Sequence, residues 1–340
     1  MGIVILGIDV SKRDFHCALV DGATVRHQSF PNSAKGFTQL HRWLENRHVE
    51  RVHGCLEATG GWSEALALDL HEHGHVVSLV NPLRIKAYGE SELSRTKTDK
   101  ADAALIARFC QAMHPEPWQP PSAEYRRLQQ LARRRVALDE MRTQETNRLQ
   151  GPTIDHDVVA SIEATLHFLN QQIDRIDAQM RELIDNDPTL RGQRDLLQTI
   201  PGVGERLATT LLGEIPNITE FRNGKAIAAF VGLCPREFRS GTSVSSAWLS
   251  RRGNAHVRRA LFMPAIVAMK HNPVLSAFAR RLHEAGKRGK RVIAAVMRRL
   301  LVLAYGVLKS NRPFDPEFGC GRRHGQTNHA LAPHRNAALA

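Results

Sequence analysis

The chain of 340 residues has few cysteines and no apolar run long enough to cross a membrane. Its first residues lack the basic segment and cleavable apolar stretch of a secretory signal peptide. The cysteines are scattered and include no Cys-x-x-Cys pair, which excludes a disulfide framework and a zinc knuckle. We therefore expect no membrane partner and a cytoplasmic location with free, buried thiols. The five cysteines are Cys17, Cys55, Cys110, Cys234 and Cys320.

Acidic residues are too few to balance the basic ones. Lys and Arg number 47 against 34 Asp and Glu, so the formal net charge is +13. Such an excess usually accompanies a polyanionic partner, and nucleic acid is the default. A merely solvated surface would spread these charges, whereas here they cluster. We therefore expect a nucleic-acid-binding protein.

The first part of the chain alternates between short apolar runs and amphipathic segments, which predicts the order βββαβαβα. Tight turns separate the first three strands, so these should form an antiparallel meander. The order is that of the ribonuclease-H-like α/β arrangement. The predicted strands span 3–9, 14–20, 26–30, 51–57 and 75–81, and the predicted helices span 36–46 and 62–73, with a further helix from Pro82.

A helix is predicted over 99–113, because Thr98 can cap its start and acids suit its first turn. Asp99 and Asp102 lie three residues apart and project from one face of this helix. They repel each other there unless a cation lies between them. On their own, the two acids are typical of an ordinary exposed helix start.

Two further acids end predicted strands. Asp9 ends the first strand and Glu57 the fourth, and these strands lie side by side in the ribonuclease-H-like arrangement. The helix carrying Asp99 and Asp102 would pack across the same edge. Carboxylates are ligands for hard divalent ions. Four converging acids therefore predict a two-metal site for phosphoryl transfer that holds Mg²⁺ or Mn²⁺.

Residues 122–196 change in character to a basic helix with one apolar stripe, broken at Gly151-Pro152, and a second apolar-striped segment. The second stripe suits an antiparallel helical hairpin or a dimeric coiled coil. The turn at 200–204, Ile-Pro-Gly-Val-Gly, resembles a helix-hairpin-helix turn, which serves either to bind phosphate or to join packed helices. The stripe consists of Val158, Ile162, Leu166, Leu169, Ile173, Ile176, Met180 and Leu183.

Ser240 is a candidate nucleophile. It lies between Arg239 and Gly241, with Arg236 close by, and guanidinium groups beside a hydroxyl suit attack on a phosphate. The alternative is a polar loop, and composition alone does not select among the hydroxyls present. The rival hydroxyls are those of Thr242, Ser243, Ser245 and Ser246.

Basic residues are dense after this loop and predict a surface that grips phosphates regardless of sequence. The tail over 315–340 lacks periodicity and is predicted to be disordered. His71, His73 and His75 are predicted to be solvated surface histidines, because no other ligand clusters with them in the sequence. The candidate phosphate-binding residues are Arg236, Arg239, Arg251, Arg252, Lys287, Arg288, Lys290 and Arg291.

Eight short motifs together resemble the DEDD-type insertion-sequence transposases, the RNA-guided bridge recombinases that include pilin-gene invertases. They occur in family order over roughly residues 3–314. The motifs are Gly-Ile-Asp-Val-Ser-Lys (7–12), Leu-Glu-Ala-Thr-Gly (56–60), Val-Asn-Pro (80–82), Lys-Thr-Asp-Lys-Ala-Asp-Ala (97–103), Ile-Pro-Gly-Val-Gly (200–204), Phe-Val-Gly-Leu-Cys-Pro-Arg (230–236), Ser-Gly-Thr-Ser (240–243) and Arg-Arg-Ala-Leu-Phe-Met-Pro-Ala (258–265).

The resemblance implies an α/β plus α fold. It implies a RuvC-like domain over 1–121 with its acidic tetrad on Asp9, Glu57, Asp99 and Asp102, a coiled-coil connector over 122–196, and a mainly helical transposase domain over 197–314. The implied nucleophile is Ser240, which forms a phosphoserine ester with DNA. The implied partners are donor and target double-stranded DNA, a structured guide RNA, and further copies of the chain in a dimer or tetramer.

A different class of enzyme would share most of these features. A RuvC-like, metal-dependent, structure-specific nuclease would use the same four acids but would activate water, which leaves Ser240 without a role. The two hypotheses differ in whether DNA becomes covalently attached to the protein.

Overall fold

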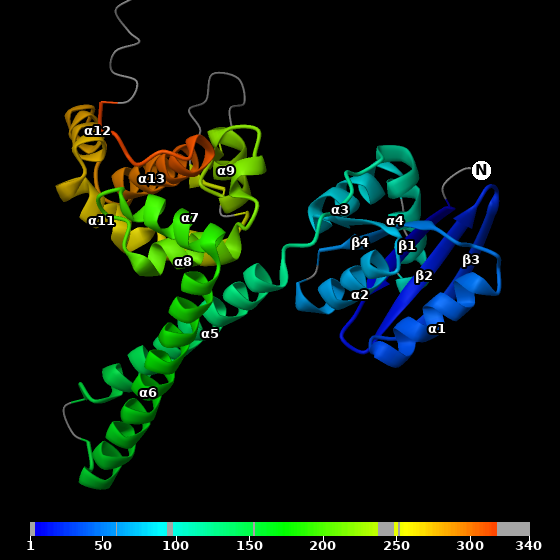
Figure 1. The fold of residues 1–340 in the computed structure, drawn as a ribbon, viewed down its shortest axis with the longest axis horizontal. Helices are drawn as coiled ribbons and strands as arrows, with labels where there is room; N and C mark the ends of the chain where they lie inside the picture. The colour runs from blue at the N-terminus through cyan, green and yellow to red at the C-terminus, as the bar shows by residue number, and fades with distance from the viewer. Residues whose placement is uncertain are drawn as a thin grey trace, which may run out of the picture. The chain divides into compact units, whose positions relative to one another are not determined.

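The computed structural model describes residues 4–58, 60–93, 98–151, 154–236, 248–250 and 252–317. The chain divides into two compact units, Met1–Pro120 and Pro121–Ala340, whose elements are drawn in Figure 1.

The N-terminal unit is built on a five-stranded sheet in the order β3-β2-β1-β4-β5. The first three strands are antiparallel, while β4 and β5 run parallel to β1. This confirms the predicted meander and the predicted pairing of the first and fourth strands. The strands are β1 (Val4–Val10), β2 (Asp14–Asp21), β3 (Thr24–Pro31), β4 (Val52–Glu57) and β5 (Val76–Val80).

Helices cover both faces of this sheet, which is why its central strands β1 and β4 are mostly apolar. On one face, α1 (Ala34–Glu45) and α2 (Gly61–Glu72) pack their leucines against Leu6 and Ile8 of β1. On the other face lie α3 (Pro82–Ser91) and α4 (Asp99–Met113). The helix predicted over 99–113 is therefore present with the same bounds.

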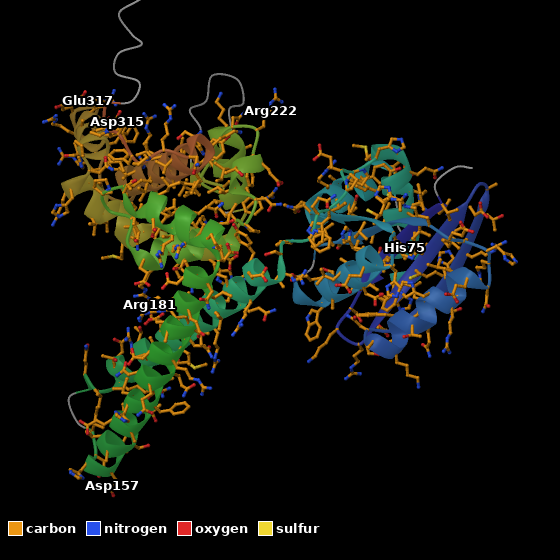
Figure 2. All side chains as sticks on the ribbon, viewed as in Figure 1. His75, Asp157, Arg181, Arg222, Asp315 and Glu317 are labelled. Carbon is orange, nitrogen blue, oxygen red and sulfur yellow. The ribbon has the colours of Figure 1, made fainter. Side chains whose placement is uncertain are left out.

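The second unit begins with a long helical hairpin made by α5 (Ala123–Arg148) and α6 (His156–Asn186) (Figure 1). Its seam buries Leu138 against Leu169 and Ile173. The apolar stripe of the sequence thus packs within one chain. The fully exposed Asp157 marks the far end of the hairpin (Figure 2).

The rest of this unit is a helical bundle around α13 (Lys290–Ser310), which α7, α9, α11 and α12 contact. Its residues Val296, Leu300 and Ala304 are fully buried. The surrounding elements are α7 (Pro188–Gln198), α8 (Glu205–Glu214), the 3₁₀ helix η1 (Ile218–Glu220), α9 (Gly224–Val231), the strands β6 (Pro235–Arg236) and β7 (Trp248–Leu249), α10 (Ala255–Ala260), α11 (Phe262–His271) and α12 (Pro273–Glu284).

No helix in the described part of the chain is both long and apolar enough to cross a membrane. Three of the four described cysteines are buried, and all four are free thiols. The fifth, Cys320, and the predicted disordered tail from residue 318 onward lie outside the described residues.

Candidate active site at the sheet edge

Two of the predicted acids end neighbouring parallel strands. Ile8 of β1 lies opposite Leu56 of β4, so the next residues, Asp9 and Glu57, emerge at the same edge of the sheet. Both side chains are half-buried. The C-terminal edge of parallel strands therefore presents two carboxylates side by side, as the sequence predicted.

Helix α4 crosses β1 in very close contact beside this edge. A Cβ atom on Gly7 would lie 2.3 Å from both the carbonyl oxygen of Ala103 and the backbone nitrogen of Ala107, so only glycine fits. The start of the helix is capped by Thr98, whose hydroxyl accepts from the N–H of Ala101 at 3.2 Å. Asp102 directly precedes Ala103 and therefore lies beside β1, the strand that carries Asp9 near its end.

The electrostatics show that the four acids share one environment. Burial raises the pKa of Asp9, and the charges of Asp102 and Asp99 raise it further, against the opposing effect of His16. Burial likewise raises the pKa of Glu57, followed by the charges of Asp9 and Asp102. The charges of the neighbouring acids therefore make Asp9 and Glu57 harder to ionise.

A set of mutually repelling carboxylates is the kind of site that a hard divalent cation stabilises. The donors are all oxygen, which fits Mg²⁺ or Mn²⁺ better than softer ions. Among the described residues, no three of these four acids bring ligand atoms within 4.8 Å of one another. The carboxylates are thus spread more widely than the ligands of one compact ion site.

His16 also belongs to this edge, although the sequence did not single it out. It lies opposite Asp9 in the β1–β2 ladder, and its Nε2 atom is 3.5 Å from Oδ2 of Asp99. The register of the β1–β2 hairpin could have predicted this position, because the pairing of Ile8 with Cys17 places His16 opposite Asp9. Its imidazole can offset negative charge or move a proton here.

Ser240 lies outside the described residues, as do Arg239, Arg251 and the side chain of Arg236. The two ends of the intervening segment are described. Arg236 of β6 pairs with Trp248 of β7, and the N–H of Ser250 donates to the carbonyl of Cys234 at 2.9 Å. The segment 237–247 therefore starts and ends at neighbouring points of the second unit.

The candidate phosphate-binding side chains that lie in the described part of the chain are exposed. Lys287, Arg288, Lys290 and Arg291 surround the turn between α12 and α13, and none has an ion pair among the described residues. Arg252 is exposed at the start of the segment leading to α10. Cations at the N-terminus of a helix oppose its dipole, so an anion bound there would relieve an unfavourable arrangement.

Comparison with known proteins identifies the family. Residues 6–152 match a family described as Transposase, and residues 194–280 match the Transposase IS116/IS110/IS902 family. The Pilin gene-inverting protein of Moraxella lacunata is 36% identical over 314 residues, which cover 91% of this chain and 97% of that protein. The chain belongs to the IS110 family of transposases. It is accordingly a DNA recombinase.

More distant relatives agree with this assignment. The Transposase for insertion sequence element IS1328 of Yersinia enterocolitica is 24% identical, and the match covers 79% of this transposase and 84% of that protein. The solved structure of T. thermophilus RuvC in complex with Holliday junction substrate covers 34% of this transposase and 100% of that chain, with 16% identity and a TM-score of 0.27. That similarity is too weak to support a conclusion.

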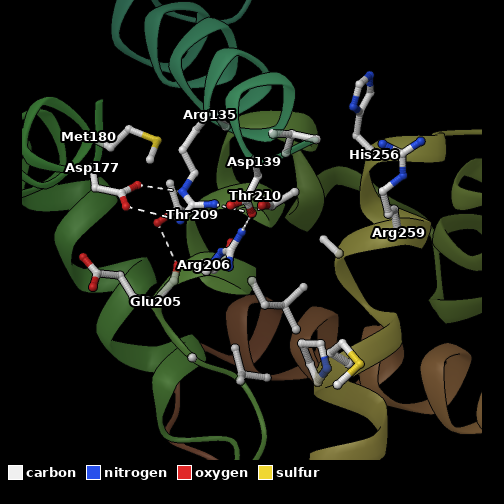
Figure 3. Close-up of a pocket in the computed structure, with 18 of the residues that line it drawn as sticks. Arg135, Asp139, Asp177, Met180, Glu205, Arg206, Thr209, Thr210, His256 and Arg259 are labelled. Atoms are coloured by element: carbon white, nitrogen blue, oxygen red, sulfur yellow. Dashed lines mark hydrogen bonds and ion pairs between the residues drawn. The ribbon is translucent and has the colours of Figure 1, made fainter. Parts of the chain in front are cut away.

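The second unit of the transposase also contains a cavity of about 1020 Å³, lined by residues of α5, α6, α8 and α11. Figure 3 shows Arg135 and Arg206 converging on Asp139 within it. Arg135 also donates to Asp177 at 2.9 Å. Because these arginines are already paired with acids, the cavity suits a phosphate less well than the exposed basic turn.

The turn at 200–204 of the transposase packs tightly. Gly202 has φ +100°, and a Cβ there would lie 2.6 Å from the Cβ of Ala268 on α11. Gly204, which precedes α8, has no atom within 4 Å of its Cβ position. Gly202 therefore has a structural role, while phosphate binding at this turn stays a prediction.

The interpretation of the histidines is corrected by the structure. His75 is buried, with 7% of its surface exposed, and burial, followed by the charges of His41 and His73, lowers its pKa to about 4. His73 does have neighbours, because its Nδ1 atom lies 3.8 Å from Oδ2 of Asp69 and its ring stacks on His41. Helix packing brings in partners that the spacing of His71, His73 and His75 did not reveal.

Proposed function

We propose that this transposase cuts and rejoins double-stranded DNA through a phosphoserine intermediate. Ser240 is the nucleophile, and Asp9, Glu57, Asp99 and Asp102 hold Mg²⁺ or Mn²⁺. The supporting observation is the mutual repulsion of the acids, which raises the pKa of Asp9 and of Glu57 beyond the effect of burial. A bound divalent cation removes this repulsion, so the site is matched to one.

The proposed chemistry needs no external energy source. The metal ions, when bound, polarise the phosphate and stabilise the oxygen that leaves. The oxygen of Ser240 loses its proton and bonds to phosphorus, while the bond from phosphorus to a deoxyribose oxygen breaks and that oxygen is protonated. Rejoining reverses this step, because a deoxyribose hydroxyl of another DNA end attacks the ester and Ser240 regains its proton.

Two described features of the second unit support a role for Ser240 at the DNA. The segment 237–247 is fastened at both ends by the β6–β7 pair, and exposed cations lie at Lys287, Arg288, Lys290 and Arg291 in the same unit. Cations of this kind bind the phosphate backbone whatever the base sequence. The protein would thus supply affinity for the DNA backbone and the groups that cut and rejoin it.

In this proposal, another molecule selects the DNA sequence. We propose a structured guide RNA that pairs with both donor and target DNA, by the logic of other guided systems. We also propose a dimer or tetramer in which the acids of one subunit act with Ser240 of another. In this proposal residues 1–121 form the RuvC-like domain, 122–196 the connector and 197–314 the serine-bearing domain, and the assembly works in the bacterial cytosol.

The decisive experiment looks for DNA attached to Ser240. Labelled junction DNA, cognate RNA and Mg²⁺ are incubated with wild type, with Ser240→Ala and with the control Ser243→Ala. The products are run on a denaturing gel with and without protease. We expect a protease-sensitive adduct in wild type and in the control, and none in Ser240→Ala.

Two outcomes would overturn the assignment. An adduct that is lost in Ser243→Ala but kept in Ser240→Ala would move the nucleophile to the neighbouring hydroxyl. Cleavage without any adduct, unaffected by either substitution, would mean that water attacks the phosphate and that the protein is a metal-dependent nuclease.

A further inference from the structure

A second cluster of metal-binding side chains lies on the helical face formed by α1 and α2. His41 is on α1, Asp69 is on α2 and His73 directly follows α2. Nε2 of His41 lies 2.7 Å from Oδ2 of Asp69, and Nδ1 of His73 lies 3.8 Å from the same oxygen. One ligand atom from each of the three residues lies within 4.8 Å of the others.

The local fold holds these groups together. Asp69 and His73 are four residues apart, so they project from one face of α2. The rings of His41 and His73 stack with their centroids 3.8 Å apart. All three side chains lie at the C-terminal end of α2, where the helix dipole is negative and favours a cation.

His75 is a buried neighbour of this cluster and has an unpartnered nitrogen of its own. Its ring stacks near that of His41, with centroids 5.6 Å apart, and only 7% of the residue is exposed. Its Nδ1 atom is buried and has no hydrogen-bond partner. A buried polar nitrogen without a partner is costly and calls for an explanation. Figure 2 labels His75 in the N-terminal unit.

We propose that His41, Asp69 and His73 bind a divalent transition-metal ion of the zinc class. Two imidazoles and one carboxylate are a ligand set that suits Zn²⁺ and excludes Mg²⁺. Bonds of about 2.0–2.2 Å in a tetrahedral site put ligand atoms roughly 3.3 Å apart, between the 2.7 Å and 3.8 Å separations observed. The ion replaces two contacts, the His41–Asp69 hydrogen bond and the 2.7 Å hydrogen bond between Nδ1 of His73 and the backbone carbonyl of Asp69.

This site is distinct from the acids at the sheet edge. Glu57 is the last residue of β4, whereas His75 immediately precedes β5, and the two strands are parallel. The two groups therefore lie at opposite ends of the strands. The ion would connect α1 to α2. With three protein ligands and His73 partly exposed, a fourth position is open to water.

The test measures Zn²⁺ binding to untagged, full-length protein after removal of metals with a chelator. Zn²⁺ is titrated against a chromophoric competitor, and Co²⁺ is used separately because its visible absorption reports tetrahedral nitrogen and oxygen ligands. We expect one tight site per chain, and a rise of several degrees in the melting temperature with Zn²⁺. Excess Mg²⁺ should not displace the Zn²⁺, and the further rise in melting temperature on adding Zn²⁺ should persist in its presence.

The matched variants are His73→Gln and, as the control, His71→Gln on the same helix end. His73→Gln should weaken binding by about 100-fold or more and abolish the Zn²⁺-induced shift in melting temperature, since ligands contribute at least as much as their supporting groups. His71→Gln and Asp102→Asn should bind Zn²⁺ as wild type does. Because His73 is exposed, its variant should fold, which circular dichroism checks.

Wild-type protein without a stoichiometric site, or His73→Gln with unchanged affinity, would overturn the proposal. Weakened binding in Asp102→Asn together with unchanged binding in His73→Gln would place the ion at the acids instead. None of these results depends on cleavage activity, so the zinc site and the recombinase mechanism are tested separately.

Discussion

Gly7 and Ala103 are in backbone contact, since a Cβ on Gly7 would lie 2.3 Å from the carbonyl oxygen of Ala103. The backbone cannot move aside as a flexible side chain would, so Gly7→Ala must push α4 away from β1. We expect a loss of about 1–3 kcal/mol in the free energy of unfolding, as is usual for overpacking, and a large loss of DNA cleavage. Urea denaturation and a cleavage assay measure the two effects.

The control for this prediction is Gly54→Ala on the neighbouring strand. Its added Cβ would meet a side-chain atom of Leu70 at 3.4 Å, an ordinary contact. It should therefore leave cleavage intact. If Gly7→Ala cleaves DNA as well as Gly54→Ala does, the close approach of α4 does not position the acids.

Asp102→Asn should abolish cleavage while binding of RNA survives, because only the metal site is damaged. The same substitution should stabilise the metal-free fold. The pKa values of Asp9 and Glu57 are raised, so these two groups hold protons more tightly in the folded state than in the unfolded chain. The free energy of unfolding therefore falls as the pH rises from about 4 through the raised pKa values. Removing the charge at residue 102 lessens that fall.

Urea denaturation in a chelator at pH 5 and pH 8 measures this change for Asp102→Asn, wild type and the control Asp157→Asn. The control removes a fully exposed acid at the far end of the hairpin and should behave as wild type. Unchanged cleavage in Asp102→Asn would refute the tetrad. An unchanged pH dependence would show that Asp102 does not repel Asp9.

Glu214 is a buried acid of the second unit that forms an ion pair with Arg133. Its two oxygens accept from Arg133 at 2.6 and 2.9 Å, and Asn254 donates to it at 2.8 Å. Burial raises its pKa, but the hydrogen bonds of Arg133 and Asn254 outweigh this, so the pKa lies below its ordinary value. Glu214→Ala should cost about 1–3 kcal/mol, because it removes the buried acceptor of the hydrogen bonds from Arg133 and Asn254.

The pH dependence of this pair has a definite sign. A lowered pKa means that the stabilisation is present above the unfolded value near 4.3 and is lost as pH falls through the folded value. Thermal unfolding between pH 3 and pH 6 should therefore show a steeper loss in wild type than in Glu214→Ala. The control Glu205→Gln removes an exposed pair with Arg181 and should cost at most about 1 kcal/mol.

Arg288→Ala should weaken binding of all DNA sequences alike and reduce the salt slope of binding by about 1, since one phosphate contact is lost. Fluorescence anisotropy at several salt concentrations, with matched and unmatched duplexes, provides the measurement. Lys35→Ala removes the same charge from an exposed position on α1 and should leave the slope unchanged. A loss confined to one sequence would mean that Arg288 reads bases.

Some features followed from the sequence because their causes are local. Thr98 and the acids after it predicted a helix over 99–113, and capping depends only on residues within one turn. The placement of Asp9 and Glu57 also followed, because strand order and strand ends together determine which residues share a sheet edge. His16 lies at the same edge because the β1–β2 register places it opposite Asp9.

The sequence by itself thus determined the strands, the capped helix, the acids at the sheet edge and the family motifs. Tertiary structure alone decided that the α5–α6 stripe packs within one chain, that His41 meets Asp69 from 28 residues away, and that Arg133 meets Glu214 from 81 residues away. The reason is physical. Periodicity shows which face of a helix is buried, but only packing of whole elements determines which distant side chain lies opposite it.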